Sequence, residues 1–164
     1  QLPYSLLWRA LEFEILPRCR QLGIGIITYS TLLHGLRSGR YRSADEFPAE
    51  RARTRHFSSK RPQTRHGQAG CEELTFATIR RIQSLCEEAG VGMAEAALAW
   101  AVHQPGITAV LAGARSPAQV QENAAAADVQ LPQGLLDSLS TAGDDLKKTL
   151  GAAPDMWQSP GRTR

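Results

Sequence analysis

Residues 24–29 read I-G-I-I-T-Y, a nearly continuous apolar run that is rich in β-branched residues. Such a run predicts a strand that is covered on both faces, as in a parallel sheet. Residues 12–22 come before it, with Pro17 near their first turn and Gly23 after their end, and this pattern predicts a helix. A helix, a short connection and a buried strand in this order indicate an α/β fold built from β-α-β units.

The same alternation returns after residue 72. Apolar residues at helical spacing predict one helix over residues 72–90 and a second that starts near Met93 and is broken at residues 104–106. Residues 107–112 (I-T-A-V-L-A) predict a second buried strand. The sequence S-P-A-Q at residues 116–119 is a capping box with proline at the first helical position, so a helix is expected from there to about residue 127. A last amphipathic helix is expected over residues 132–146.

The chain has 164 residues, of which 42% are hydrophobic and 21% are charged, a composition that excludes disordered and fibrous proteins. Its first residues already resemble the interior of a fold, so we expect a fragment that begins inside a domain. We assign residues 1–150 to that domain and residues 151–164 to a flexible tail. No apolar run approaches the ~18 residues of a membrane span, and no signal-like leader is visible, so a cytoplasmic protein without membrane contact is expected.

Residues 37–65 are strongly basic, with nine arginines and lysines against three acids. A connection this long and aperiodic inside a compact domain is more often functional or mobile than structural. Nucleic-acid binding is one hypothesis for it. The segment has only three aromatic residues and no recognisable binding motif, so a solvated or cofactor-covering loop is preferred and no nucleic-acid partner is expected.

The histidines and cysteines do not indicate a metal centre. The four histidines have no partners at metal-ligand spacing, and the three cysteines form no C-x-x-C pair. We therefore expect no metal, and we expect the cysteines to be reduced thiols.

The first candidate site lies where the strand at 107–112 leads into the next helix, in the sequence G-A-R-S-P-A-Q-V-Q-E-N at residues 113–123. Gly113 between a strand end and a helix start lets the backbone approach a ligand, and the helix N-terminus favours a phosphate. Arg115 could pair with a second phosphate group. Gln119, Glu122 and Asn123 share one helix face beside this anion site, while Val120 and Ala124 are expected to point toward the barrel or sheet. The alternative is that Ser116 and Gln119 only cap the helix and the others are solvated.

The second candidate site follows the strand at 24–29, because loops after the carboxyl ends of parallel strands bind ligands in α/β folds. Tyr29 could stack on a planar ring, and Gly35, Gly39 and Arg40 could cover phosphates. The alternative is that Tyr29 belongs to the core and the glycines only mark turns.

Several ordered motifs carry a resemblance to a known family. They are Q-L-P-Y-S-L-L-W-R at residue 1, L-G-I-G-I-I-T-Y-S at residue 22, G-L-R-S-G-R-Y at residue 35, Q-P-G-I-T-A-V at residue 104 and G-A-R-S-P-A-Q-V-Q-E-N at residue 113. Together they resemble the C-terminal half of the aldo-keto reductases. The resemblance implies an α/β fold, the C-terminal part of a (β/α)₈ TIM barrel that is incomplete in this chain. It also implies a barrel that binds NADPH and reduces carbonyl compounds with a catalytic Tyr, Asp, Lys and His.

The resemblance implies cofactor contacts at both candidate sites. Gln1 corresponds to the residue that bonds the nicotinamide carboxamide, and Tyr29 to the tyrosine that stacks on the nicotinamide. The pyrophosphate would be bound by the loop that carries Ser30, Leu32, Gly35 and Arg40.

At the other end of the cofactor, the resemblance places Gly113 and Arg115 beside the 2′-phosphate of the adenosine, with Ser116 and Gln119. Glu122 and Asn123 would hold the adenine. The residues implied by the resemblance coincide with the two sites found from spacing.

The sequence also departs from the family pattern. Family members usually carry proline where Thr31 stands, a small residue in place of His34, and lysine in place of Arg40. The motifs that hold the catalytic Asp, Tyr, Lys and His lie upstream of Gln1, so no catalytic residue is assigned here and this chain alone is not expected to transfer hydride.

Two functions follow as hypotheses. The first is a fragment of an NADP-dependent reductase that converts aldehydes or ketones to alcohols. The second is a non-catalytic relative that keeps the cofactor site as a binding or regulatory module. A strand stub is also expected at Gln1. Together with the strands at 24–29 and 107–112 it makes three strands, which cannot close a barrel of eight, so open apolar faces are expected.

Overall fold

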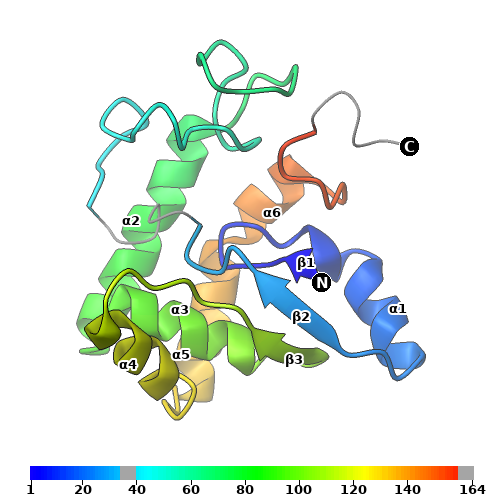
Figure 1. The fold of residues 1–164 in the computed structure, drawn as a ribbon, viewed down its shortest axis with the longest axis vertical. Helices are drawn as coiled ribbons and strands as arrows, with labels where there is room; N and C mark the ends of the chain where they lie inside the picture. The colour runs from blue at the N-terminus through cyan, green and yellow to red at the C-terminus, as the bar shows by residue number, and fades with distance from the viewer. Residues whose placement is uncertain (34–39, 159–164) are drawn as a thin grey trace.

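The computed structural model describes residues 1–33 and 40–158. Three parallel strands form one sheet in the order β1-β2-β3 (Figure 1), namely β1 (Leu2–Pro3), β2 (Ile26–Tyr29) and β3 (Ile107–Val110). Leu2 pairs with Thr28 and Ile26 with Ile107. Both strands predicted from apolar runs are therefore confirmed, in a sheet with the parallel pairing that β-α-β units require.

The helices follow the predicted order, with one difference near the C-terminal end. They are η1 (Ala10–Glu12), α1 (Ile15–Gln21), α2 (Glu72–Glu88), α3 (Met93–Val102), α4 (Pro117–Ala125), α5 (Gln133–Ala142) and α6 (Asp144–Leu150). The single helix expected over 132–146 is wrong, because the chain breaks at Gly143 into α5 and α6. A Cβ at Gly143 would lie 2.8 Å from the Leu6 carbonyl oxygen, so the break lets the backbone pass close to the N-terminal segment. Within the described ranges, no helix combines the length and apolarity that crossing a bilayer requires.

The core lies between the N-terminal segment, α2, α3 and α5. Tyr4 stacks on Trp100 with ring centroids 5.2 Å apart, and both side chains are fully buried. The indole N–H of Trp100 donates to the Ser140 hydroxyl at 2.9 Å, which ties α3 to α5. Every residue of α3 from Ala96 to Ala101 is buried, as close packing of an alanine-rich helix requires.

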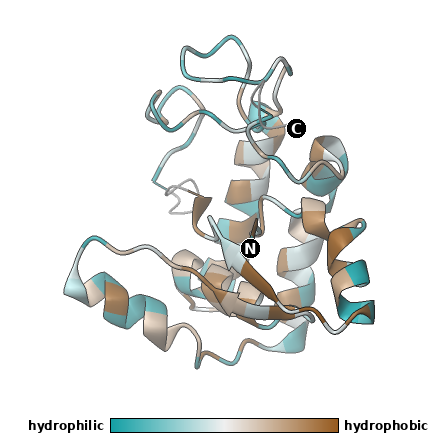
Figure 2. Ribbon diagram, turned by 45° about the vertical axis from the view of Figure 1, so that its right-hand side comes forward, coloured by the Kyte–Doolittle hydropathy of each residue, from teal (hydrophilic) through white to brown (hydrophobic). Residues whose placement is uncertain are grey.

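One face of the sheet is open. The side chain of Ile27 in β2 is 41% exposed and that of Leu111 after β3 is 47% exposed, and Figure 2 shows hydrophobic residues along these strands. Helix α4 has no buried residue, and Val120, expected to face the sheet, is 58% exposed. The expectations of strands covered on both faces and of a packed Val120 are therefore wrong here. The physical reason is the expected one, since three strands do not close a barrel.

The basic segment after residue 40 is packed against the body of the protein. Phe57 is buried and stacks on Phe47 with centroids 5.0 Å apart. Arg55 donates hydrogen bonds to the carbonyl of Leu150 at 2.6 Å and to the side chain of Gln68 at 2.8 Å. Arg61 is paired with Glu72 and Asp45. Arg55 and Arg61 therefore bind other residues of the protein and hold the basic segment in place. The segment is not the wholly solvated loop that the sequence allowed.

Residues 151–158, which the sequence assigns to a flexible tail, contact the core in the structure. Met156 is fully buried, and its carbonyl accepts a hydrogen bond from the Arg55 backbone N–H at 2.8 Å. The Arg55 guanidinium also donates to the Ala153 carbonyl at 3.3 Å. An apolar side chain and two backbone acceptors thus connect this segment to the basic one.

The buried side chain of His56 connects the basic segment to the N-terminal segment, and we predict that this contact stabilises the fold less at acidic pH. Its Nε2–H donates to the Leu7 carbonyl at 2.8 Å, so its Nδ1 accepts from the Thr54 hydroxyl at 2.9 Å. Burial lowers the pKa of His56 from 6.5 to about 4. As the pH falls from 6.5 to 4, the unfolded chain takes up a proton that the folded chain excludes. We expect this to lower the free energy of unfolding by about 3 kcal/mol.

The measurement is urea unfolding of the protein and of His56→Gln at several values across this pH range. The variant should be less stable near neutral pH but should lose less stability on acidification. Carboxylates whose pKa is lowered in the fold, such as Glu12 and Glu72, contribute equally to both proteins. Parallel stability curves for the two proteins would mean that His56 is not the source of the acid sensitivity.

Candidate functional site

The two sites predicted from spacing meet in one cleft of about 500 Å³. The turn after β2 forms one wall and the connection from β3 to α4 forms the other, and both paths can be followed in Figure 1. Of the predicted residues, the cleft is lined by Ser30, Leu32, Arg40, Gly113, Arg115 and Gln119. Segments about 80 residues apart in sequence are thus brought together by the parallel pairing of β2 with β3, since the carboxyl ends of both strands open onto the same edge of the sheet.

The turn after β2 has an unusual backbone. Ser30 and Leu33 have positive φ values of 57° and 43°, and the Leu33 N–H donates to the Ser30 carbonyl at 2.9 Å. Side-chain-bearing residues seldom adopt this left-handed conformation, which is costly and concentrates at ligand-binding sites. The strand therefore ends in a tight, strained turn at the mouth of the cleft.

The opposite wall is held by hydrogen bonds around the start of α4. The Ser116 hydroxyl accepts from the Gln119 N–H at 3.3 Å, as expected for an N-cap. The Gln119 side chain accepts from the N–H of Arg115 at 2.8 Å, one residue earlier than the expected capping box would place it. Asn123 donates to the Gly113 carbonyl at 3.2 Å. The capping alternative is thus correct for Ser116, while Gln119 both supports this connection and lines the cleft.

Gly113 is not required by the packing of the chain itself. A Cβ at this position would meet no atom within 4 Å. The space beside this backbone is therefore open to a ligand, as the sequence pattern suggested.

Guanidinium groups dominate the electrostatics of the cleft. Arg40, Arg51 and Arg115 all line it, and none of its lining residues within the described part of the chain is acidic. Three cations around a space of this size favour an anionic ligand. The sequence analysis did not identify Arg51, because this residue lies in a segment without periodicity. The only signal for it is that it belongs to the basic segment at residues 37–65.

The remaining predicted residues lie elsewhere. Gln1 is exposed and Tyr29 half-buried at the carboxyl end of β2, and neither contributes to the lining of the cleft. Glu122 is exposed on α4. Gly35, like His34, lies outside the described residues.

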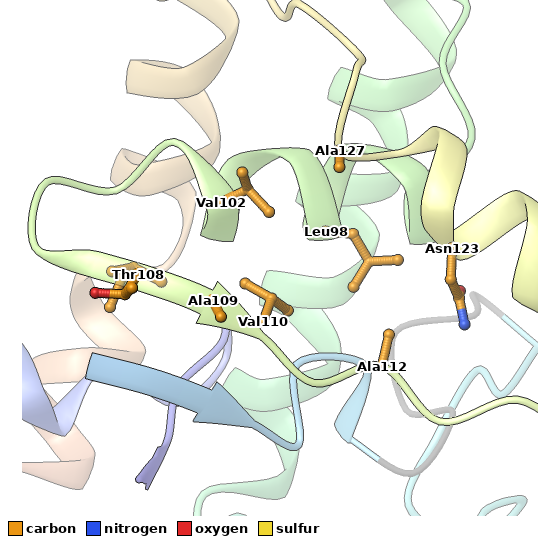
Figure 3. Close-up of a pocket in the computed structure, with 9 residues that line it drawn as sticks. Leu98, Val102, Thr108, Ala109, Val110, Ala112, Asn123 and Ala127 are labelled. Atoms are coloured by element: carbon orange, nitrogen blue, oxygen red, sulfur yellow. The ribbon is translucent and has the colours of Figure 1, made fainter. Parts of the chain in front are cut away.

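Asn123 lines a second, smaller cavity of about 260 Å³ between α3, β3 and α4 (Figure 3). Its other walls are mainly aliphatic, including Leu98, Val102 and Val110, and among the described residues that line it Thr108 is the only other polar side chain. This lining suits packing better than binding of a charged ligand. Among residues 1–33 and 40–158, no group of three metal-binding side chains is close enough to hold a metal ion.

Tyr4 is the most deeply buried tyrosine of the described chain, and its environment does not suit a tyrosine that gives up its proton in catalysis. Its hydroxyl donates to Glu12 at 2.8 Å, and burial, together with the Glu12 charge, raises its pKa far above the ordinary value. Tyr4 is therefore held as a structural donor beside a carboxylate.

Comparison with known proteins finds relatives of this chain among oxidoreductases. The chain is 32% identical over 137 residues to the uncharacterized oxidoreductase YrpG of Bacillus subtilis (strain 168), a match that covers 84% of the chain and 37% of the relative. It is 31% identical over 131 residues to an NADH-specific methylglyoxal reductase of Escherichia coli (strain K12), covering 80% and 37%. A probable voltage-gated potassium channel subunit beta of Arabidopsis thaliana is 30% identical over 122 residues, covering 73% and 34%.

A solved structure shares the fold. The thermostable aldo-keto reductase Tm1743 superposes with a TM-score of 0.55 and 19% identity, over 86% of this chain and 38% of that one. The chain thus spans little more than a third of the length of these relatives. Residues 1–142 match the profile of the aldo/keto reductase family. With its parallel sheet, its helix order and this match over most of its length, the chain belongs to the aldo/keto reductase family.

Proposed function

We propose that this chain supplies the cofactor-binding part of an NADP-dependent aldo-keto reductase that reduces aldehydes or ketones to alcohols in the cytoplasm. The observation that carries the proposal is the meeting of the turn after β2 with the start of α4 around a cleft lined by three arginines. The partner is a small carbonyl compound, and neither nucleic acid nor a membrane is needed.

The arginine-rich lining of the cleft supports, as ligand, a dinucleotide with a phosphate on its ribose. Backbone and side chains of Ser30, Leu32 and Arg40 would bind the pyrophosphate, with Arg51 adding a further cation. Arg115 would pair with the 2′-phosphate beside the open backbone of Gly113 and the capped start of α4. One relative is named an NADH-specific methylglyoxal reductase, so similarity to known proteins does not by itself favour NADP, and the proposal of NADP rests on Arg115.

The other cofactor contacts lie outside the cleft lining. Tyr29 would stack on the nicotinamide, Gln1 would bond its carboxamide, and Glu122 and Asn123 would contact the adenine. The cofactor supplies the hydride, and the residues of this chain position it. The catalytic Tyr, Asp, Lys and His of the family are not assigned to any residue here.

A second candidate is a non-catalytic, cofactor-binding regulatory protein. It is favoured by the similarity to proteins named as probable potassium channel beta subunits in Arabidopsis thaliana and Oryza sativa subsp. japonica. This candidate shares the cleft and the cofactor with the first but predicts no reduction of carbonyl compounds.

The experiment uses the intact protein, meaning the complete reductase of which we propose this chain to be a part. NADPH is titrated into it, and oxidation of NADPH is assayed with small aldehydes and ketones. We expect binding and aldehyde-dependent oxidation. Tyr29→Phe should retain cofactor affinity because stacking does not need the hydroxyl, whereas Tyr29→Ala should weaken it with little change in melting temperature. If Tyr29→Ala has a much lower melting temperature but binds NADPH with normal affinity, Tyr29 is a core residue and does not stack on the cofactor.

The two candidates separate on turnover. Binding without oxidation of NADPH by any carbonyl compound would favour the regulatory candidate. Absence of NADPH binding by the intact protein would refute both.

A further inference from the structure

Thr31 carries a polar group that the fold leaves without a partner. The residue is 1% exposed, and its buried hydroxyl oxygen has no hydrogen bond to any residue of the described ranges, 1–33 and 40–158. Buried hydroxyl groups are nearly always hydrogen-bonded, because an unpaired one loses its contacts with water and gains nothing in return. A valine would fill nearly the same volume without this loss, so the packing of the chain does not explain a threonine here.

The position of Thr31 connects this hydroxyl with the cleft. Thr31 follows Ser30, whose φ is 57°, in the strained turn after β2, and it is one of the residues that line the cleft. Arg40, Arg51 and Arg115 line the same space. A buried donor without a partner in the wall of a cationic cleft is suited to an anionic oxygen, which accepts a stronger hydrogen bond than a neutral one.

We propose that the Thr31 hydroxyl donates a hydrogen bond to a phosphate oxygen of the dinucleotide pyrophosphate bound in this cleft. The proposal rests on the proposed function, because it takes NADPH as the ligand. It adds a side-chain donor where the family pattern usually has proline, which offers none.

Access to the hydroxyl requires a small local change. The oxygen is shielded from solvent in the ligand-free structure. A rotation of about 120° around χ1 of Thr31 would turn its hydroxyl into the position that the methyl group or the β-hydrogen now occupies. Because the whole residue is only 1% exposed, the neighbouring wall of the cleft must also shift for a ligand to reach it. Serine keeps the donor and rotates more freely, whereas valine keeps the shape and loses the donor.

The test compares Thr31→Val and Thr31→Ser in the intact protein, with NADPH and adenosine 2′-phosphate as probes. NADPH contains the pyrophosphate, and adenosine 2′-phosphate reports only on the Arg115 end of the cleft. We expect the Kd for NADPH to rise about tenfold in Thr31→Val, the loss of one hydrogen bond to a charged group. Thr31→Ser should bind NADPH nearly as the parent does. Both variants should bind adenosine 2′-phosphate like the parent.

Melting temperature without ligand supplies the control for a structural role. Thr31→Val should melt at the same temperature as the parent or higher, because the unpaired hydroxyl is gone. If Thr31→Val binds NADPH as tightly as the parent, the hydroxyl proposal is overturned while the proposed function stands. Equal weakening of both probes would also overturn it, as a general distortion of the cleft. If the parent itself does not bind NADPH, the proposed function fails and this proposal falls with it.

Discussion

Replacement of Arg9 by alanine is expected to lower the free energy of unfolding by about 3 kcal/mol. This is the lower end of the usual cost of removing one member of a buried ion pair, because Glu12 keeps Lys147 as a second cation. The Arg9 side chain is 7% exposed and makes two parallel hydrogen bonds to Glu12, at 2.7 and 2.8 Å. It also donates to Asp144 at 2.9 Å and to the carbonyl of Ser140. One guanidinium thus joins the N-terminal segment to α5 and α6.

The pKa values agree with a tightly coupled pair. Burial alone would lower the pKa of the Arg9 guanidinium, but the hydrogen bonds and charge of Glu12 outweigh it and the pKa is raised. Burial alone would raise the pKa of Glu12, but Arg9 outweighs it and the pKa is lowered. Without Arg9, the half-buried Glu12 keeps Lys147 at 3.1 Å as its remaining cation.

Urea unfolding at neutral pH measures the effect, with Arg18→Ala as the matched control. Arg18 is an exposed arginine of α1 whose guanidinium donates only a long, 3.3 Å bond to Gln21, so its removal should cost little. Arg9→Lys should fall between the two, because an ammonium group cannot reproduce the parallel pair of bonds. If Arg9→Ala is no less stable than Arg18→Ala, the ion pair does not stabilise the fold.

The largest effect on binding is expected from Arg115→Ala. If Arg115 pairs with the 2′-phosphate, its removal should weaken NADPH about ten- to a hundredfold and leave NADH nearly unchanged. The backbone N–H of Arg115 is held by the Gln119 side chain, and this bond does not involve the guanidinium. The wall of the cleft should therefore survive the substitution, and only the charge should be lost.

Titration of both cofactors into the intact protein provides the measurement. Arg81→Ala, which removes an exposed arginine of α2 outside the cleft lining, is the control for the loss of one positive charge. It should change neither affinity. If Arg115→Ala lowers the affinity for NADPH and for NADH by the same factor, Arg115 does not pair with the 2′-phosphate.

Local signals in the sequence were sufficient for most elements. The apolar run at residues 24–29 and the cap at Ser116 depend on residues within a few positions of one another, so periodicity and cap chemistry identify them directly. The break at Gly143 was missed because the close contact made there, with the Leu6 carbonyl, joins residues more than 130 positions apart in the sequence.

The sequence predicted the two walls of the cleft as two separate sites. Each site follows the carboxyl end of a strand, and the residues there indicated an anion site before their arrangement was known. Arg51 could not be assigned in this way, because the segment around it has no repeating pattern and is placed by contacts such as that of Arg55 with Leu150, 95 residues away. The lack of a partner for the Thr31 hydroxyl likewise appears only when the surrounding atoms are placed.

The sequence by itself determined the α/β class, the family resemblance and the residue types at the two strand ends, because these depend on short-range patterns and on ordered motifs. Only the tertiary structure decided that both strand ends share one cleft, that Arg51 joins it, and that residues 40–70 and 151–158 pack on the core. The physical reason is that these features arise from burial and hydrogen bonding between distant segments. Such contacts produce no periodic pattern in the amino-acid sequence.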